Sequence, residues 1–80
     1  MTLWFENSQG TKRQIADCAT WDDVCYCIYK FIEQCNENKP EKNKFKSYYM
    51  RSWKEDGMTK IDVGSHTEFF YWEGEYPCSD

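Results

Sequence analysis

The fold of this chain is decided by the stretch TWDDVCYCIYKFIEQC, residues 20–35. Thr20 is suited to cap a helix N-terminus, and Asp23, three residues later, completes a shortened capping box. One stripe of apolar side chains then recurs at helical spacing: Val24, Ile28, Phe31, Ile32 and Cys35. Pro40 cannot continue a helix. The stretch therefore predicts one amphipathic helix that ends within residues 36–40.

Two strands are expected before this helix. Residues 2–6 alternate in character, and residues 11–18 are extended in the same way. Between them, NSQG at residues 7–10 is typical of a turn, because these residues tolerate positive φ or bind their own backbone. The expected faces place Leu3 and Phe5 opposite Trp4, and Ile15 opposite Ala16 and Cys18. The segment predicts an antiparallel hairpin.

Two or three further strands are expected after the helix. Residues 45–53 and 58–63 alternate, and Asp56-Gly57 between them favours a tight hairpin turn. Residues 68–72 either continue the fourth strand or form a fifth. The order β-β-α-β-β predicts an α+β fold, a four- to five-stranded antiparallel sheet with one amphipathic helix on one face. Residues 1–80 are expected to form one compact domain, with residues 74–80 as a C-terminal tail.

The charge distribution favours a protein partner. The net charge is −4, and no Lys or Arg follows Lys60, whereas five carboxylates do: Asp62, Glu68, Glu73, Glu75 and Asp80. Direct binding to nucleic acid is not expected, because phosphate neutralisation requires a basic surface. A host protein with a basic surface is the better electrostatic match.

The chain has no features of a membrane or secreted protein. It lacks a run of about 18 apolar residues, and its start lacks the basic and apolar regions of a signal peptide. Five cysteines, an odd number, favour reduced thiols. We therefore expect a cytoplasmic protein that makes no contact with membrane.

Aromatic residues make up 19% of the sequence, more than so small a core can bury. If the helix covers one sheet face, the other face is expected to carry Trp4 and Tyr48, with Phe70 and Trp72 as further candidates. Exposed aromatic surface marks interaction sites. The candidate protein-binding residues are therefore Trp4, Tyr48, Glu68, Phe70, Trp72 and Glu73, and a homodimer through this face is a second possibility.

Residues for catalysis or metal binding are few. Asp62, His66 and Glu68 resemble an acid–base cluster, but a structural histidine is favoured. Cys25 and Cys27 point about 200° apart on a helix and cannot grip one ion together, so no metal or other cofactor is expected. As an alternative to protein binding, Arg51, Trp53, Asp62 and His66 form a candidate small-ligand site, since rings can stack bases and arginine binds phosphate.

Four stretches carry a family resemblance: Leu3-Trp4-Phe5, Phe31-Ile32, the segment FKSYYMRSW at residues 45–53 and DVGSHTEFF at residues 62–70. In these the chain resembles small proteins encoded by phages and prophages of Firmicutes and related gut bacteria. The resemblance implies a bacterial host cytoplasm, and it assigns no catalytic residue. Small acidic phage proteins often block host defences, CRISPR nucleases included, by stoichiometric binding.

The sequence therefore favours a non-catalytic accessory protein that binds a partner stoichiometrically, with an anti-defence, anti-CRISPR-like inhibitor as its most specific form. A sequestering protein for a small nucleotide signal is the alternative. An enzyme that depends on His66 is the least favoured hypothesis.

Overall fold

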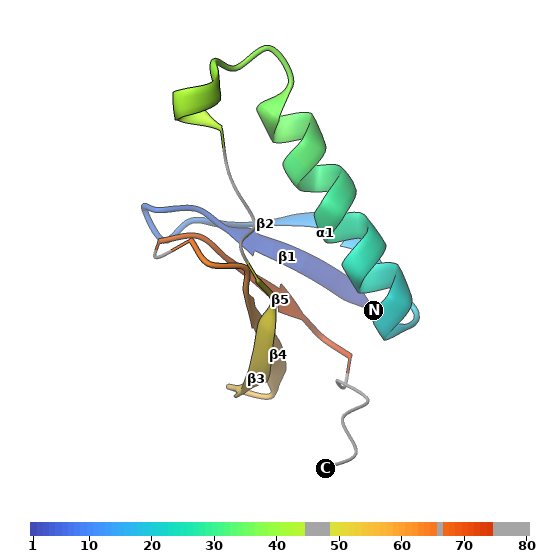
Figure 1. Cartoon of the computed structure of the whole chain (residues 1–80). Coiled ribbons are helices and arrows are strands. Elements are labelled where there is room, and N and C mark those ends of the chain that lie inside the picture. The colour runs from blue at the N-terminus through green and yellow to red at the C-terminus, as the bar shows by residue number, and fades with distance from the viewer. Residues whose placement is uncertain (45–48, 66, 75–80) are drawn as a thin grey trace.

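The computed structural model describes residues 1–44, 49–65 and 67–74. Its elements follow the order β1 (Thr2–Glu6), β2 (Lys12–Asp17), α1 (Trp21–Asn36), the 3₁₀ turn η1 (Glu41–Asn43), β3 (Arg51–Glu55), β4 (Met58–Asp62) and β5 (Phe69–Trp72). Figure 1 shows α1 lying over one side of the sheet, with the β3–β4 hairpin turned strongly away from β1 and β2. The predicted α+β fold is confirmed.

The five strands form one antiparallel sheet in the order β2-β1-β5-β4-β3. Residues 68–72 therefore contribute a separate fifth strand, which lies at the centre of the sheet and not at its edge. β5 pairs with β1 through Leu3 opposite Trp72 and Phe5 opposite Phe70. It pairs with β4 through Ile61 opposite Phe70. The C-terminal strand thus joins two hairpins that are distant in sequence.

The first hairpin contains a turn and a bulge. The Asn7 side chain accepts hydrogen bonds from the backbone N–H groups of Gln9 and Thr11 at 2.9 and 3.0 Å, and Gly10 has φ of +83°. The register shifts between Leu3 and Trp4, which face Ala16 and Gln14. Ile15 is the extra residue. The expectation that Ile15 and Ala16 lie on opposite faces is therefore wrong, and both pack against the core.

The helix begins with the expected capping box. Thr20 Oγ1 accepts from the Asp23 N–H at 3.2 Å, and Asp23 Oδ2 accepts from the Thr20 N–H at 3.3 Å. A cap of this kind contributes about 1 kcal/mol. Val24 and Ile28 are buried, and Phe31 and Ile32 pack beside them. The predicted stripe is confirmed for these four residues. Its last member, Cys35, is half-buried outside the core cluster, and Cys27 packs against the core in addition.

The core lies between α1 and the sheet. The Phe31 ring packs against Phe5 and Phe70 with centroids 4.7 and 5.8 Å away, and the Trp21 ring lies 6.0 Å from that of Trp72. Phe70 is fully buried and Trp72 is 2% exposed. The candidate placement of these two residues on the second face is therefore wrong, because the register with Leu3 and Phe5 turns both toward the helix.

The second hairpin is shorter than expected. Asp56 and Gly57 both have positive φ, 55° and 79°, as the Asp-Gly signal predicts for a tight turn. β3 runs from Arg51 to Glu55, and the described residues 49–50 before it are not strand. Residues 45–48, which include Tyr48 and the expected start of this strand, lie outside the described part of the chain. Ile61, in β4, and Val63, which directly follows it, are fully buried and belong to the core.

Candidate functional site

The register of the strands defines the sheet face that points away from α1, called here the open face. Trp4 lies between Gln14 and Tyr71, and Tyr71 lies opposite Lys60, which in turn lies opposite Trp53. Side chains alternate along a strand. The open face therefore comprises Lys12, Gln14, Asp17, Thr2, Trp4, Glu6, Phe69, Tyr71, Met58, Lys60, Asp62, Arg51, Trp53 and Glu55. No described helix lies on it (Figure 1).

Tyr71, at the centre of the open face, is only 5% exposed. The ammonium group of Lys12 lies 4.1 Å from the centroid of its ring, and its hydroxyl donates to Glu6 Oε1 at 3.0 Å. Burial raises the pKa of Tyr71. The centre of the open face is therefore covered by the protein's own side chains, so the face is not the bare aromatic layer that the sequence suggested.

A second group of contacts surrounds Lys60. Its Nζ atom lies 4.3 Å from the centroid of the Phe69 ring and 3.4 Å from Glu55 Oε2. The Trp53 indole N–H donates to Glu55 Oε1 at 3.1 Å, and this hydrogen bond is the main cause of the lowered pKa of Glu55. These contacts fix the Trp53 indole, which is still 38% exposed.

Three of the four candidate ligand-binding residues come together at one end of the open face. Arg51 Nη2 donates to Asp62 Oδ2 at 2.8 Å, and Asp62 Oδ1 accepts the Gly64 N–H at 2.9 Å. The guanidinium carbon lies 5.3 Å from the Tyr49 ring centroid and 6.0 Å from that of Trp53. The hydrogen bond to Asp62 is the main cause of the raised pKa of Arg51. His66, the fourth candidate, lies outside the described residues.

The candidate protein-binding residues are divided by the structure. Trp4 and Glu73 meet on the open face, where the indole N–H donates to Glu73 Oε2 at 3.0 Å. Glu68 is half-buried in the turn before β5, where its carboxylate contacts the Ser65 and Thr67 hydroxyls. Phe70 and Trp72 belong to the core. Of the candidates within the described residues, only Trp4 and Glu73 are placed together at the surface; Tyr48 lies outside those residues.

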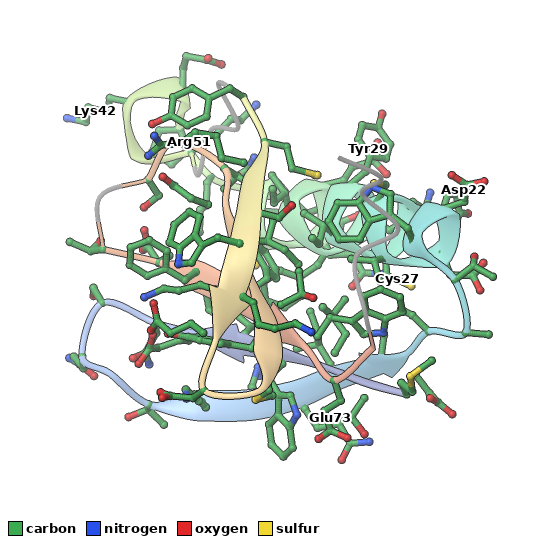
Figure 2. The ribbon with its side chains drawn as sticks, turned by 90° about the horizontal axis from the view of Figure 1, so that it is seen from below. Asp22, Cys27, Tyr29, Lys42, Arg51 and Glu73 are labelled. Carbon is green, nitrogen blue, oxygen red and sulfur yellow. The ribbon has the colours of Figure 1, made fainter. Side chains whose placement is uncertain are left out.

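Carboxylates gather at the end of the open face that Glu73 occupies. Asp17 lies opposite Thr2, whose carbonyl accepts the Glu73 N–H at 3.0 Å, so the two acidic residues lie on either side of Thr2. Glu55, opposite Met58, closes the β3–β4 hairpin at the same end. Figure 2 shows Glu73 and Arg51 at opposite ends of the sheet. Asp17, Glu55 and Glu73, with Trp4 and Trp53 beside them, are called here the acidic end.

Some exposed aromatic residues were not among the candidates. Tyr26 and Tyr29, on the outer face of α1, are each 63% exposed, and the Tyr29 hydroxyl lies 3.4 Å from Glu33 Oε2. The sequence contained this signal, since both tyrosines fall outside the apolar stripe. Lys12, Lys60 and Tyr71 gave no local signal, because their contacts depend on strand pairing.

The cysteines of the described residues are free thiols. Cys18 is fully buried. Its pKa is raised to about 12, mainly by burial and secondly by a hydrogen bond with Cys27. The N-terminal ammonium opposes this shift, but burial outweighs it, so the environment disfavours the deprotonated thiolate, which is the reactive form. Cys18 serves the core, where its carbonyl accepts the Trp72 indole N–H at 3.1 Å.

Because the pKa of Cys18 is raised in the folded protein, the free energy of unfolding should fall at alkaline pH. The thiol deprotonates near pH 9 when unfolded and near 12 when folded, so its contribution is complete below pH 9 and is lost as pH rises toward 12. Denaturant titrations in reducing buffer should show that Cys18→Ala flattens the fall in unfolding free energy above pH 9, by up to about 1.4 kcal/mol per pH unit. Val24→Ala also leaves a cavity in the core but removes no thiol, so the unfolding free energy should fall with pH as steeply as in wild type. An equal flattening in Val24→Ala would contradict the assignment of the pH dependence to Cys18.

Within residues 1–44, 49–65 and 67–74, no group of three or more His, Cys, Asp or Glu is placed to hold a metal ion. No helix in the described chain is long and apolar enough to cross a membrane. Comparison with protein-family models, curated proteins and solved structures found no match.

Proposed function

We propose that this protein is a non-catalytic binding protein whose acidic end recognises a basic surface on a partner protein. The observation that carries the proposal is the set of two indoles held in place by carboxylates: Trp4 by Glu73 and Trp53 by Glu55. Each hydrogen bond fixes an aromatic ring at the surface before a partner arrives. Ordering these side chains in advance lowers the entropic cost of association.

The residue types at the acidic end are those that dominate binding energy at interfaces. Tryptophan is among the most enriched residues at hot spots, where a buried aromatic anchor is surrounded by weaker contacts. The Trp4 indole N–H that donates to Glu73 is neutral, so Glu73 keeps its negative charge. Asp17 is paired with the N-terminal ammonium at 2.6 Å and Glu55 with Lys60 Nζ at 3.4 Å, so these two carboxylates offer a partner less net charge. A basic partner would therefore meet both apolar area and charge, and the charge would speed association and set orientation.

The first test is a charge reversal away from the core. Asp17→Lys together with Glu73→Lys should weaken retention of the bound protein at least about tenfold, because two attractive contacts become repulsive. The measurement is quantitative mass spectrometry of proteins that immobilised wild type and variant retain from a bacterial host lysate, over a salt series. The retained protein should be basic, and its release should require less salt with the variant.

A matched control lies on the opposite side of the molecule. Glu33→Lys in α1 with Glu37→Lys at its C-cap makes the same change in net charge at two exposed positions and should retain the partner as wild type does. Equal losses for both pairs would mean that net charge alone governs retention. That result, or unchanged retention with the first pair, would refute recognition through the acidic end.

The setting that fits this proposal is interference with a host defence, as the resemblance to phage and prophage proteins implies. A stoichiometric inhibitor needs only a rigid surface and no catalytic group. The retained protein would then be a component of a bacterial defence system, an anti-CRISPR-like role being one form. Loss of defence on expression of wild type, but not of the Asp17 and Glu73 variant, would support this setting.

A small nucleotide signal is the second candidate ligand, favoured by Arg51 between the Tyr49 and Trp53 rings. The rings could stack on a base while the guanidinium contacts phosphate. Asp62 already neutralises much of that cation, which is why protein binding is preferred. A thermal shift with a nucleotide panel, absent in Arg51→Gln, would favour this alternative. The least favoured hypothesis is an enzyme that depends on His66, which lies outside the described residues.

A further inference from the structure

β3 lies at one end of the sheet order, so one of its two sides faces no other strand of the described sheet. Exposed edges of this kind are templates for pairing with another chain. The opposite end of the sheet is β2, whose regular pairing is interrupted by the bulge at Ile15. Bulges blunt edges. β3 has continuous register with β4 from Arg51 to Glu55 and is the more regular edge.

The sequence of β3, RSWKE, is complementary to itself when read in the opposite direction. If a second copy of β3 runs antiparallel with Trp53 facing Trp53, then Arg51 of each copy faces Glu55 of the other. Ser52 then faces Lys54 of the second copy. No two like charges lie directly opposite, and cross-strand pairs of opposite charge or of aromatic rings stabilise antiparallel strands.

The backbone is in phase with this arrangement. Glu55 and Met58 close a two-residue turn, so they exchange backbone hydrogen bonds, and by alternation Trp53 does the same with Lys60. The backbone groups of Ser52 therefore point away from β4. In the paired arrangement, the backbone N–H and C=O groups of Ser52 face the outward backbone groups of Lys54 in the second copy. The two facing Trp53 residues form a non-hydrogen-bonded pair, the kind of pair in which side chains approach most closely.

We propose that a second copy of this chain adds to the edge of β3 by antiparallel pairing centred on Trp53. The two sheets then become one continuous sheet, and the two open faces lie on the same side. Trp53, 38% exposed in the single chain, is covered by its counterpart. The dimer uses Trp53 and Glu55, which also belong to the acidic end, but it needs no partner protein, and its test uses only the purified chain.

The dimer is expected to be weak. A strand of five residues offers far less than the roughly 800 Å² per partner of a stable complex. Sedimentation velocity from about 10 µM to about 1 mM should therefore show a concentration-dependent shift from monomer to dimer. Over the same range, the amide N–H of Ser52 should become slower to exchange with solvent.

Two variants test the register. Glu55→Arg puts a second cation opposite Arg51 of the other copy and should raise the dimer Kd at least about tenfold. Ser52→Pro removes the outward N–H, a substitution that edge strands tolerate, and should leave a monomer at every concentration. Glu33→Arg, an equal charge change on the outer side of α1, should dimerise as wild type does. Circular dichroism confirms which variants fold.

Several results would overturn the proposal. These are a monomeric wild type at about 1 mM, dimerisation by Glu55→Arg equal to that of wild type, or loss of the dimer with Glu33→Arg. If Ser52→Pro fails to fold, the Glu55 and Glu33 variants decide the question, because both residues are at the surface. Since the proposed function is tested at Asp17 and Glu73, failure of one proposal leaves the other standing.

Discussion

Trp72→Ala should lower the free energy of unfolding by about 3–5 kcal/mol, the usual cost of removing a buried aromatic side chain. Trp72 is 2% exposed, contacts the Trp21 ring and donates its indole N–H to the Cys18 carbonyl. The substitution leaves a cavity and removes one of the two hydrogen bonds to the Cys18 carbonyl, which also accepts from the N-terminal ammonium at 3.1 Å. Small domains are stable by only about 5–15 kcal/mol. The midpoint temperature of thermal unfolding should therefore fall by at least about 15 °C.

Trp53→Ala is the matched control, because it removes the same side chain from the open face. Its cost should be under about 1 kcal/mol, since Trp53 is 38% exposed and its hydrogen bond to Glu55 is at the surface. Denaturant unfolding of both variants at a concentration where the protein is monomeric gives the comparison. Similar losses for the two would contradict the register that turns Trp72 toward α1.

Gly74→Ala should cost about 1–3 kcal/mol by overpacking. A Cβ atom at Gly74 would lie 2.4 Å from Cζ2 and 2.6 Å from Cε2 of the Trp72 indole. The ring cannot move easily, because it is enclosed in the core. Gly74, predicted to begin a tail, is instead buried, and its carbonyl accepts the Thr59 hydroxyl at 3.0 Å.

The measurement for Gly74→Ala is the midpoint of denaturant unfolding, with Glu73→Ala as control. Glu73 is exposed, and its loss removes only a surface hydrogen bond from Trp4, so the change should stay under about 1 kcal/mol. A wild-type midpoint for Gly74→Ala would show that residues 73–74 do not fold back onto the Trp72 ring.

The elements predicted correctly are those specified by local chemistry. The helix begins where Thr20 and Asp23 cap each other, and the second hairpin turns where Asp56 and Gly57 accept positive φ. In both cases the deciding residues lie within four positions of one another. Such signals can be read from a sequence without knowing which strands are neighbours.

The errors arose where strand pairing decides. All four residues of FFYW in β5 are apolar, so alternation does not indicate which two face the helix; pairing with Leu3 and Phe5 selects Phe70 and Trp72. The bulge at Ile15 likewise depends on β1. For the site, the sequence predicted Arg51, Trp53 and Asp62 together and also Trp4 with Glu73. It missed Lys12, Lys60 and Tyr71, whose contacts join all five strands.

Carboxyl footprinting of the captured complex tests the central claim most directly. Carbodiimide labelling, read by mass spectrometry, compares each carboxylate in the free protein and in the complex. Recognition through the acidic end should protect Asp17, Glu55 and Glu73 and leave Glu33 in α1 and Glu37 at its C-cap labelled as before. Protection of Glu33 and Glu37, with Asp17 and Glu73 unchanged, would contradict the account.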